Sequence, residues 1–390
     1  MTDPSDDPAG ATSPGLRIAI DARAWDGPPT GITWYVRTLI SALASARDNN
    51  RYLLLRHAPP ERPLLTEHPR FEQQPIPAAS DLWLECNLHS LLEEWEADLY
   101  HSPFAAPPVV RPCPAVMTVH DIIPRVMPEL VDERFRAYFE ERLVHGLRRA
   151  DHLITPSAHT ARDVATFYGV PADRSTIVSE AAPPEHIRAI DAKEADLVLA
   201  EAGVRRAYLL SVGAIEPRKN VSRLLEAFEM LCVEHGPSLR LVVVGAARDR
   251  SADVARALES AAKESGVVWL EEASSSQLAA LYSRAFAFVF PSLYEGFGLP
   301  VLEAMSHGLP VIASRVSSVP ELVGEDGGIL VDPYDPRELA GAMHRLVHDD
   351  ELRRSLGAAA KSRAEQFSLA RMAEGTLAAY EKAVAGVKGV

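Results

Sequence analysis

The sequence predicts an α/β protein made of two doubly wound parallel-sheet domains. Its 390 residues are enough for two large α/β units with substantial cores. Short apolar runs alternate with amphipathic helical patterns from end to end, and these runs are apolar throughout. Continuous apolar runs are typical of strands that are covered on both faces, and such strands build parallel sheets.

The alternation of apolar runs and helical patterns occurs twice, once in each half of the chain. In the first half, strands are expected at 17–20, 52–55, 98–101, 115–120, 152–155 and 176–178. Helices are expected there at 31–46, 132–149 and 158–168. In the second half, strands are expected at 208–212, 239–244, 267–270, 287–290, 311–313 and 329–331. Helices are expected there at 221–234, 252–264, 276–283, 301–306 and 336–347.

We expect the domain boundary in the proline-containing segment that ends the first half. The first domain is predicted at 16–183 and the second at 205–367, joined by a charged surface connector at 184–204. Residues 1–15, rich in Asp, Pro, Ser and Gly, are expected to form a flexible tail. The last segment, 368–390, is predicted to be helical and either to cap the second sheet or to cross back onto the first domain.

Composition narrows the class of ligands. The chain has 40 Lys and Arg against 54 Asp and Glu, which gives a formal net charge of −14. A nucleic-acid duplex normally requires a basic face, so no nucleic-acid partner is expected. Because Cys86, Cys113 and Cys232 are widely spaced, and no Asp-x-Asp or clustered histidine pattern occurs, we expect no metal and no resident cofactor.

The expected location is the cytoplasm. No apolar run approaches the ~18 residues of a membrane-spanning helix, and the N-terminus lacks the order of a secretory signal. The predicted helix at 132–149 interleaves arginines with glutamates, which is typical of a solvated face. Peripheral contact with the inner face of a membrane is the alternative interpretation of that helix.

The segment from Pro291 to Met305 carries the strongest chemical signal. It begins where a predicted buried strand ends, passes through Gly296 and Gly298, and enters a helix. Glycines allow close approach of a ligand to the backbone, and the free amides of a helix start favour a phosphate or sugar hydroxyls. Glu295 and Glu303 flank this loop. From spacing alone, these two carboxylates could also be a solvated turn residue and a dipole-complementing helix residue.

A second segment, 211–220, follows the first predicted strand of the second domain. It contains Gly213 and the adjacent cations Arg218 and Lys219. A planar guanidinium beside a compact ammonium group can neutralise a diphosphate from two directions. The alternative is a solvated basic turn.

Together these segments resemble the retaining glycosyltransferases of family 4, or glycosyl transferases group 1. Those enzymes have the GT-B fold of two Rossmann-like domains facing across a cleft, and they use nucleotide-sugar donors. The E-x7-E pattern of the family is filled by Glu295 and Glu303, and its Gly-to-Lys spacing by Gly213 and Lys219. The resemblance implies that Glu303 binds the ribose and that Arg218 and Lys219 bind the departing diphosphate. It places the donor sugar against Glu295, Gly296, Phe297, Gly298 and Leu299.

In the first domain the resemblance rests on shorter matches. Gly31 lies in a loop similar to the one that contacts donor phosphate and acceptor in the family, although a second glycine of many members is Thr33 here. His120 ends a predicted strand and is expected beside the donor sugar. His101, which also ends a strand, and Asp121 are expected to contact the acceptor.

The predicted activity is retaining transfer of a hexose from a nucleotide-diphosphate sugar, with that sugar as co-substrate. GDP-mannose is favoured as donor, and the expected acceptor is a glycan or a lipid-linked intermediate of polysaccharide biosynthesis. Three alternatives stay open: a UDP- or TDP-sugar transferase with a soluble acceptor, a non-catalytic sugar-nucleotide-binding protein, and a dinucleotide-dependent oxidoreductase. The last should show Gly-x-Gly-x-x-Gly after an early strand, where this chain has Asp21 instead.

Overall fold

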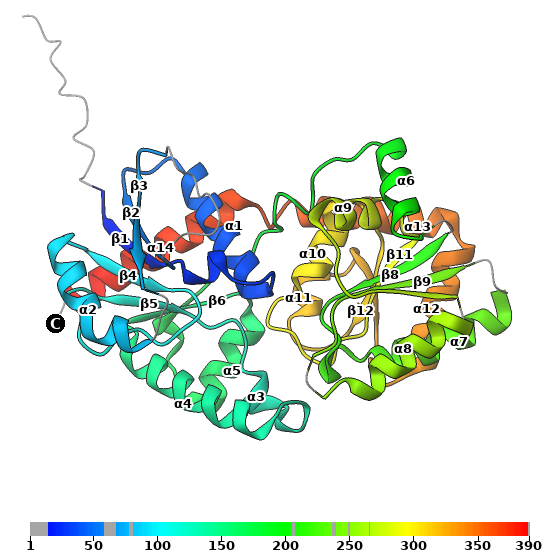
Figure 1. Ribbon diagram of the computed structural model, residues 1–390, viewed down its shortest axis with the longest axis horizontal. Coiled ribbons are helices and arrows are strands. Elements are labelled where there is room, and N and C mark those ends of the chain that lie inside the picture. The colour runs from blue at the N-terminus through cyan, green and yellow to red at the C-terminus, as the bar shows by residue number, and fades with distance from the viewer. Residues whose placement is uncertain are drawn as a thin grey trace, which may run out of the picture.

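The computed structural model describes residues 15–57, 68–77, 81–204, 207–235, 239–248, 250–264 and 266–388. Within these residues the chain forms two parallel sheets with helices packed on both faces, which confirms the predicted fold class (Figure 1). Nearly all of the expected N-terminal tail lies outside the described residues.

The first sheet has, in the described part of the chain, the strand order β3-β2-β1-β4-β5-β6-β7. Its strands are β1 (Arg17–Asp21), β2 (Arg51–His57), β3 (Phe71–Ile76), β4 (Leu99–Ser102), β5 (Ala115–Thr118), β6 (His152–Thr155) and β7 (Ser175–Ile177). Its helices are η1 (Arg23–Asp26), α1 (Gly31–Ser45), α2 (Asp81–Glu94), α3 (Ile123–Val126), η2 (Pro128–Leu130), α4 (Glu133–Arg149), α5 (Ala158–Tyr168) and η3 (Ala172–Arg174). β1 is central, with Ile18 opposite both Tyr52 and Leu99.

The second sheet, again within the described residues, has the order β10-β9-β8-β11-β12-β13. Its strands are β8 (Tyr208–Val212), β9 (Arg240–Val244), β10 (Val267–Leu270), β11 (Ala287–Phe290), β12 (Val311–Ser314) and β13 (Gly328–Val331). Its helices are α6 (Ala192–Glu201), η4 (Pro217–Lys219), α7 (Val221–His235), α8 (Ala252–Glu264), α9 (Ser275–Arg284), α10 (Leu299–Ser306), α11 (Val319–Val323), α12 (Pro336–His348) and α13 (Asp350–Ala364).

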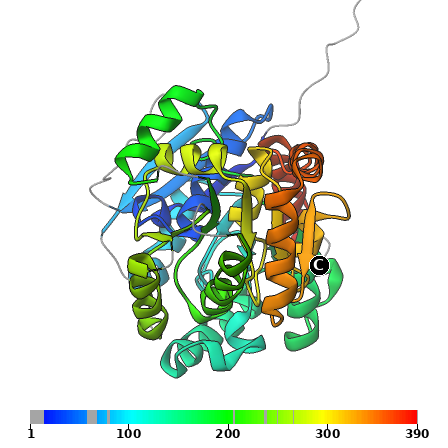
Figure 2. The same ribbon diagram turned by 90° about the vertical axis from the view of Figure 1, so that its right-hand side faces the viewer.

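Successive residues of the second sheet belong to opposite cores, as strands buried on both faces require. Leu210 packs in the core formed with α6, α9, α10 and α13, whereas Leu209 packs in the core formed with α7, α8 and α12. Figure 2 looks onto this domain, with its helices on both sides of the strands. The apolar runs of the sequence therefore follow from two-sided burial.

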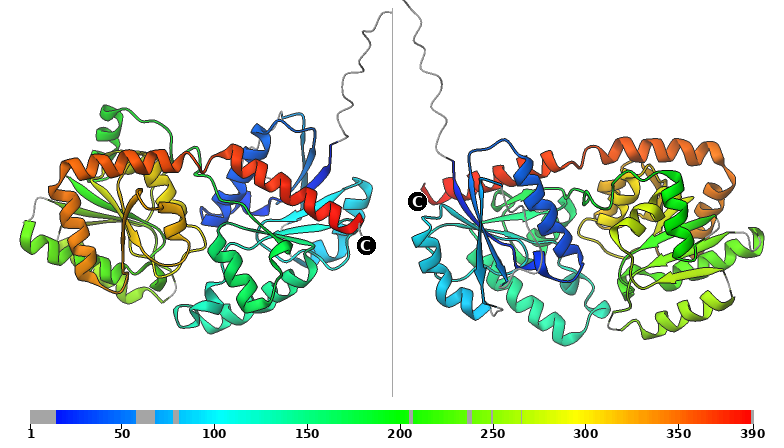
Figure 3. Two further views of the ribbon diagram at one scale, coloured as in Figure 1. Left: turned by 180° about the vertical axis from the view of Figure 1, so that it is seen from behind. Right: turned by 45° about the horizontal axis from the view of Figure 1, so that its top comes forward.

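The chain passes between the domains twice. The first passage is the segment after β7, and the second joins α13 to α14 (Leu369–Lys388). Helix α14 packs beside α1 and against the first sheet, where Met372 and Tyr380 are buried in its core. Figure 3 shows α13 and α14 running from one domain to the other.

The expected connector at 184–204 differs from the structure in one respect. Residues Ala192–Glu201 form helix α6, which begins at the N-cap Asp191. Ala195 and Leu199 are buried in the core of the second domain, and α6 packs against α9. The charged residues that suggested a surface connector lie on the other side of this amphipathic helix.

Candidate active site

The cationic turn at the end of β8 is shaped around Lys219. Gly213 has a φ of 150°, and a Cβ placed on it would lie 3.3 Å from Lys219 Cε. The short helix η4 then presents Arg218 and Lys219 and ends at Asn220, which is left-handed with a φ of 58°. Asn220 Nδ2 donates to the carbonyl oxygens of Pro291 and Pro333 at 3.0 and 2.7 Å, which fastens this turn to the loop after β11.

Glu295 receives both cations on one carboxylate oxygen. Lys219 Nζ lies 2.5 Å and Arg218 Nη1 lies 2.8 Å from Glu295 Oε1, and Ser292 Oγ donates to the same atom at 2.6 Å. Burial alone would raise the pKa of Glu295, but Arg218 and Lys219 outweigh it and hold this pKa at about 2. Burial and the neighbouring Arg218 lower the pKa of Lys219. Arg218 Nε also donates to Glu216 Oε2 at 2.9 Å, so two cations and two carboxylates form a compact charge cluster.

Gly296 is the point where the loop touches the first domain. A Cβ placed on Gly296 would lie 1.9 Å from the carbonyl oxygen of His120, so only glycine fits this approach. The loop continues through Phe297, which is buried against Phe367, to Gly298, the N-cap of α10. The backbone after Gly296 therefore runs into a helix N-terminus, where free amides are available to a ligand.

Glu303 lies on α10 and is buried. His186 Nδ1 donates to its Oε1 at 2.7 Å, and Tyr282 donates its hydroxyl proton to Oε2 at 2.7 Å. A carboxylate offers about four acceptor positions, so each oxygen keeps capacity for one further donor. Neither His186 nor Tyr282 was predicted as a partner of Glu303, because both side chains come from segments that are distant from it in the chain.

His120 is fixed by two acceptors. Its Nε2 donates to the carbonyl oxygen of Pro103 at 2.8 Å, and its Nδ1 lies 3.5 Å from Glu180 Oε1. Burial would lower the pKa of His120, but the hydrogen bond and charge of Glu180 outweigh it and raise this pKa. The ring of Tyr35 contacts the imidazole edge-on, with centroids 4.6 Å apart. These contacts fix the orientation of the His120 ring just after the carboxyl end of β5.

The other three candidates of the first domain lie in different surroundings. Gly31 is exposed at the start of α1, and nothing lies within 4 Å of a Cβ placed on it. Asp121 accepts the amide proton of Ile123 at 3.0 Å.

His101 has no exposed surface, because it is enclosed between β5 and α14. Hydrogen bonds of 2.7 and 2.9 Å join it to Tyr380 and Thr118. Burial and the nearby His120 lower the pKa of His101 to about 3. These surroundings favour a structural role for His101 over contact with an acceptor.

Helix α5 joins the first domain to this loop of the second. Ser157 Oγ donates to the carbonyl oxygen of Gly296 at 2.7 Å, and Tyr294 donates to Asp163 Oδ2 at 2.5 Å. Glu321 accepts the amide proton of Ala158 at 2.8 Å. The signal for these contacts in the sequence is only Ser157 as an N-cap, which says nothing about its partner across the interface.

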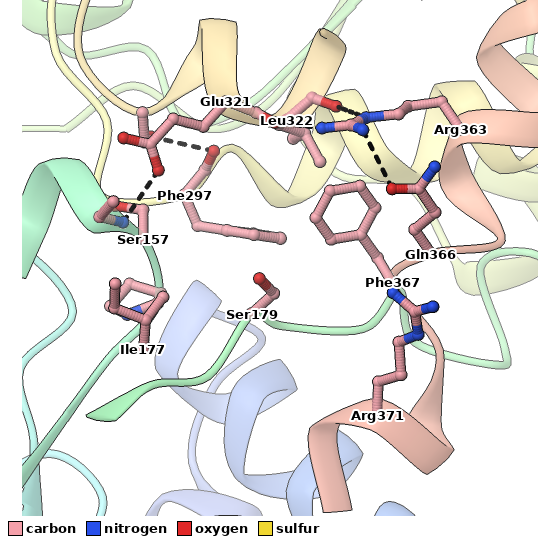
Figure 4. Close-up of a pocket in the computed structure, with 13 residues that line it drawn as sticks. Ser157, Ile177, Ser179, Phe297, Glu321, Leu322, Arg363, Gln366, Phe367 and Arg371 are labelled. Carbon is pink, nitrogen blue, oxygen red and sulfur yellow. Dashed lines mark hydrogen bonds between the residues drawn. The ribbon is translucent and has the colours of Figure 1, made fainter. Parts of the chain in front are cut away.

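A hollow of about 270 Å³ lies behind the loop, between α5, α11 and the α13–α14 passage (Figure 4). Most of the polar groups at its wall bond to other protein groups. Glu321 bonds to α5, while Arg363 donates to Gln366 and to backbone carbonyls of α11. This hollow lies beside the passage from α13 to α14, and its lining residues are different from those of the charge cluster at Glu295.

Two features are absent from the part of the chain that the structure describes. No group of three or more His, Cys, Asp or Glu side chains in this part of the chain is arranged to hold a metal ion. Likewise, none of the helices that the structure describes is long and apolar enough to cross a membrane.

Comparison with known proteins agrees with this geometry. A model of the family "Glycosyl transferases group 1" matches residues 200–363, and one of "Glycosyltransferase Family 4" matches 29–186. The chain is 30% identical over 374 residues to O-antigen chain mannosyltransferase B of Escherichia coli, covering 91% of this chain and 96% of that protein. It is 34% identical over 256 residues to an MMP alpha-(1->4)-mannosyltransferase of Mycolicibacterium hassiacum, covering 64% of this chain and 58% of that protein.

Solved structures match along most of the chain. Sucrose-phosphate synthase from Thermosynechococcus elongatus has a TM-score of 0.72 and 22% identity, covering 95% of this chain and 99% of that one. Anabaena HepE, solved with UDP-glucose, has a TM-score of 0.72 and 18% identity, covering 93% and 99%.

Two Rossmann-like domains that meet over a glycine loop and a half-buried cationic turn define a glycosyltransferase of the GT-B class. This chain belongs to glycosyltransferase family 4. It is therefore a hexosyltransferase of the retaining type, as the sequence predicted.

Proposed function

We propose that the chain transfers mannose from GDP-mannose to a glycan or lipid-linked acceptor during polysaccharide assembly. The observation that carries the donor chemistry is the convergence of Arg218 and Lys219 on Glu295, where β8 and β11 end. In open α/β sheets, ligands bind beyond the carboxyl ends of the strands. Support for mannose comes from the similarity of the chain to mannosyltransferases of Escherichia coli and Mycolicibacterium hassiacum.

The proposed roles follow from charge. Arg218 and Lys219 would bind the negative charge that develops on the departing diphosphate. Glu295 would then share these two cations with the diphosphate and accept hydrogen bonds from hydroxyls of the donor sugar. The amides of Phe297, Gly298 and Leu299 would donate to the same region of the donor. Retention would follow from attack of the acceptor hydroxyl on the face that the leaving phosphate occupies, with that phosphate taking the hydroxyl proton.

On the first domain, Gly31 leaves open space at the start of α1, where donor phosphate and acceptor are proposed to lie. His120 is proposed to face the donor sugar, with its ring held by Glu180 and the carbonyl oxygen of Pro103. Asp121 is kept as an acceptor contact. Glu303 is proposed to accept hydrogen bonds from the ribose hydroxyls with its remaining acceptor capacity.

The first experiment identifies the donor. The melting temperature of the full chain is measured with GDP, UDP and TDP and with their sugars, because a ligand that binds only the native state raises it. GDP and GDP-mannose are expected to give the largest rise, and purified chain with GDP-mannose is expected to transfer mannose. A larger rise in melting temperature with a UDP- or TDP-sugar would identify that nucleotide sugar as the donor instead of GDP-mannose. Binding without transfer or hydrolysis across the donor panel would contradict catalysis.

A lipid-linked acceptor would bring the chain to a membrane surface, and α4 supports such contact. Phe135 and Tyr138 are 52% and 55% exposed, and Arg142 lies over the Tyr138 ring at 5.0 Å. Positions 135, 138 and 142 fall on one face of a helix. Aromatic side chains beside arginines suit the interface of an anionic bilayer.

Sedimentation with vesicles tests this contact. Wild-type chain is expected to pellet with phosphatidylglycerol vesicles and to stay in solution with phosphatidylcholine. The double variant Phe135→Ser, Tyr138→Ser should lose this binding, whereas Leu197→Ser, which changes a residue 60% exposed on α6, should retain it. If both variants pelleted equally, α4 would not be the part of the chain that contacts the membrane.

A further inference from the structure

The segment between the domains places one histidine on the predicted ribose-binding carboxylate. His186 Nδ1 bonds to Glu303 Oε1 at 2.7 Å, and only 3% and 4% of these two side chains are exposed. The backbone of His186 is also held, because His307 Nε2 bonds to its carbonyl oxygen at 2.8 Å. Glu303 lies on α10 and His307 is the C-cap residue of this helix, so α10 and its C-cap hold both the ring and the backbone of His186.

The same histidine touches the first domain. Its ring contacts that of Trp34 edge-on, with centroids 4.2 Å apart, and Trp34 lies in the first turn of α1, which begins at Gly31. His186 Nε2 is buried and has no hydrogen-bond partner among the described residues. A buried polar atom without a partner is costly in a folded protein unless a ligand or solvent uses it.

We infer that His186 is a positioning residue for the nucleoside of the donor: it fixes the plane of the Glu303 carboxylate so that the remaining acceptor positions face the ribose hydroxyls. This inference rests on the proposed function, since it needs a nucleotide donor with its ribose at Glu303. Tyr282 holds only Oε2, so loss of the His186 bond would leave Oε1 without a partner and the carboxylate free to rotate. The effect is therefore expected on the ribose alone.

The test compares nucleotides that differ only in those hydroxyls. Calorimetric titration of the full chain uses GDP and UDP, each beside its 2′,3′-dideoxy analogue. Wild type is expected to bind one ribonucleotide about tenfold or more tightly than its dideoxy form, because hydrogen bonds to a charged group are strong. His186→Ala should lose most of this preference by weakening ribonucleotide binding, with little change for the dideoxy nucleotide. Glu303→Gln should lose the preference for the ribonucleotide in the same way.

Two further variants separate positioning from a structural role. In His186→Asn, the amide stands near the Nδ1 position and should restore the preference. His89→Ala removes a histidine 40% exposed on α2 and should bind as wild type does. If His186→Ala does not fold, His186→Gln replaces it, because its longer side chain carries the amide beyond Nδ1 and should also lose the preference.

The outcomes are distinct. Failure of wild type to bind GDP or UDP would overturn the proposed function, and the inference with it. A second outcome is a ribose preference that is strong in wild type and absent in Glu303→Gln but unchanged in His186→Ala or His186→Gln. This outcome would overturn the inference and leave the proposed function standing. An equal loss of affinity for both members of a nucleotide pair would also overturn it, because that is what a general structural role predicts.

Discussion

Replacing Glu295 by glutamine should weaken the folded state by about 3 kcal/mol at neutral pH. The pKa of Glu295 is about 2 in the folded chain against 4.5 for the free side chain, a shift worth about 3 kcal/mol. Removing one partner of a buried ion pair costs a similar roughly 3–5 kcal/mol. Glu216 stays paired with Arg218 at 2.9 Å, but the amide leaves Lys219, which is 10% exposed, without its carboxylate partner. The expected fall in melting temperature is roughly 6–12 °C.

The sign of the pH dependence follows from the lowered pKa. The contribution of Glu295 is complete above pH 4.5 and is lost as the pH falls towards 2, with about half gone near pH 3. The gap between wild type and Glu295→Gln should therefore close in acid. His101, which is buried with a pKa of about 3, destabilises both proteins in acid and cancels in the comparison.

Thermal and urea unfolding from pH 7 to pH 3 measure this gap, with Glu272→Gln, at an exposed position, as the matched control. GDP should raise the melting temperature of Glu295→Gln by more than that of wild type, because a diphosphate replaces the negative charge that Arg218 and Lys219 lose with Glu295. Mannose transfer should nevertheless collapse, since the sugar loses its carboxylate. A variant as stable as wild type at pH 7, or a gap independent of pH, would refute the charge-cluster reasoning.

Three other substitutions and one control substitution have defined outcomes. Lys219→Ala should weaken donor binding by about 2 kcal/mol, or roughly 30-fold, and calorimetry with GDP-mannose would contradict this if the affinity were unchanged. Gly296→Ala should force the loop from the His120 carbonyl and lower kcat/KM by at least about tenfold, whereas Gly341→Ala, where a Cβ meets nothing within 4 Å, should keep full activity and gain up to about 1 kcal/mol. Tyr294→Phe should raise the KM for donor several-fold while the melting temperature changes little, and an unaltered KM would show that its bond to α5 does not support closure of the domains.

The fold was largely predictable because burial on both faces leaves a direct trace in the sequence. In the run Leu239–Val244 every position except Arg240 is apolar, and the structure places β9 within this run. Strand β3 was not predicted, because it lies at the edge of the sheet and reads Phe-Glu-Gln-Gln-Pro-Ile, with only Ile76 buried. Helix α2 was missed as well, since its amphipathic pattern is weak and many of its residues are exposed.

The candidate site was predictable where its parts are local in sequence. Glu295, Gly296 and Gly298 lie within one loop, and the spacing from Gly213 to Lys219 can be read directly from the sequence. The partners of these residues were not predictable. Glu180 is about 60 positions from His120, and no periodicity links the two.

Helix α14 makes the first domain a discontinuous unit. Tyr380 completes the core around β1 and bonds to His101, so this core is incomplete until residues 369–388 have left the ribosome. The amino-terminal half must therefore wait for the carboxyl-terminal half during synthesis. A separately expressed first domain would need residues 369–388 joined to it, and without them the exposed groove beside α1 would favour aggregation.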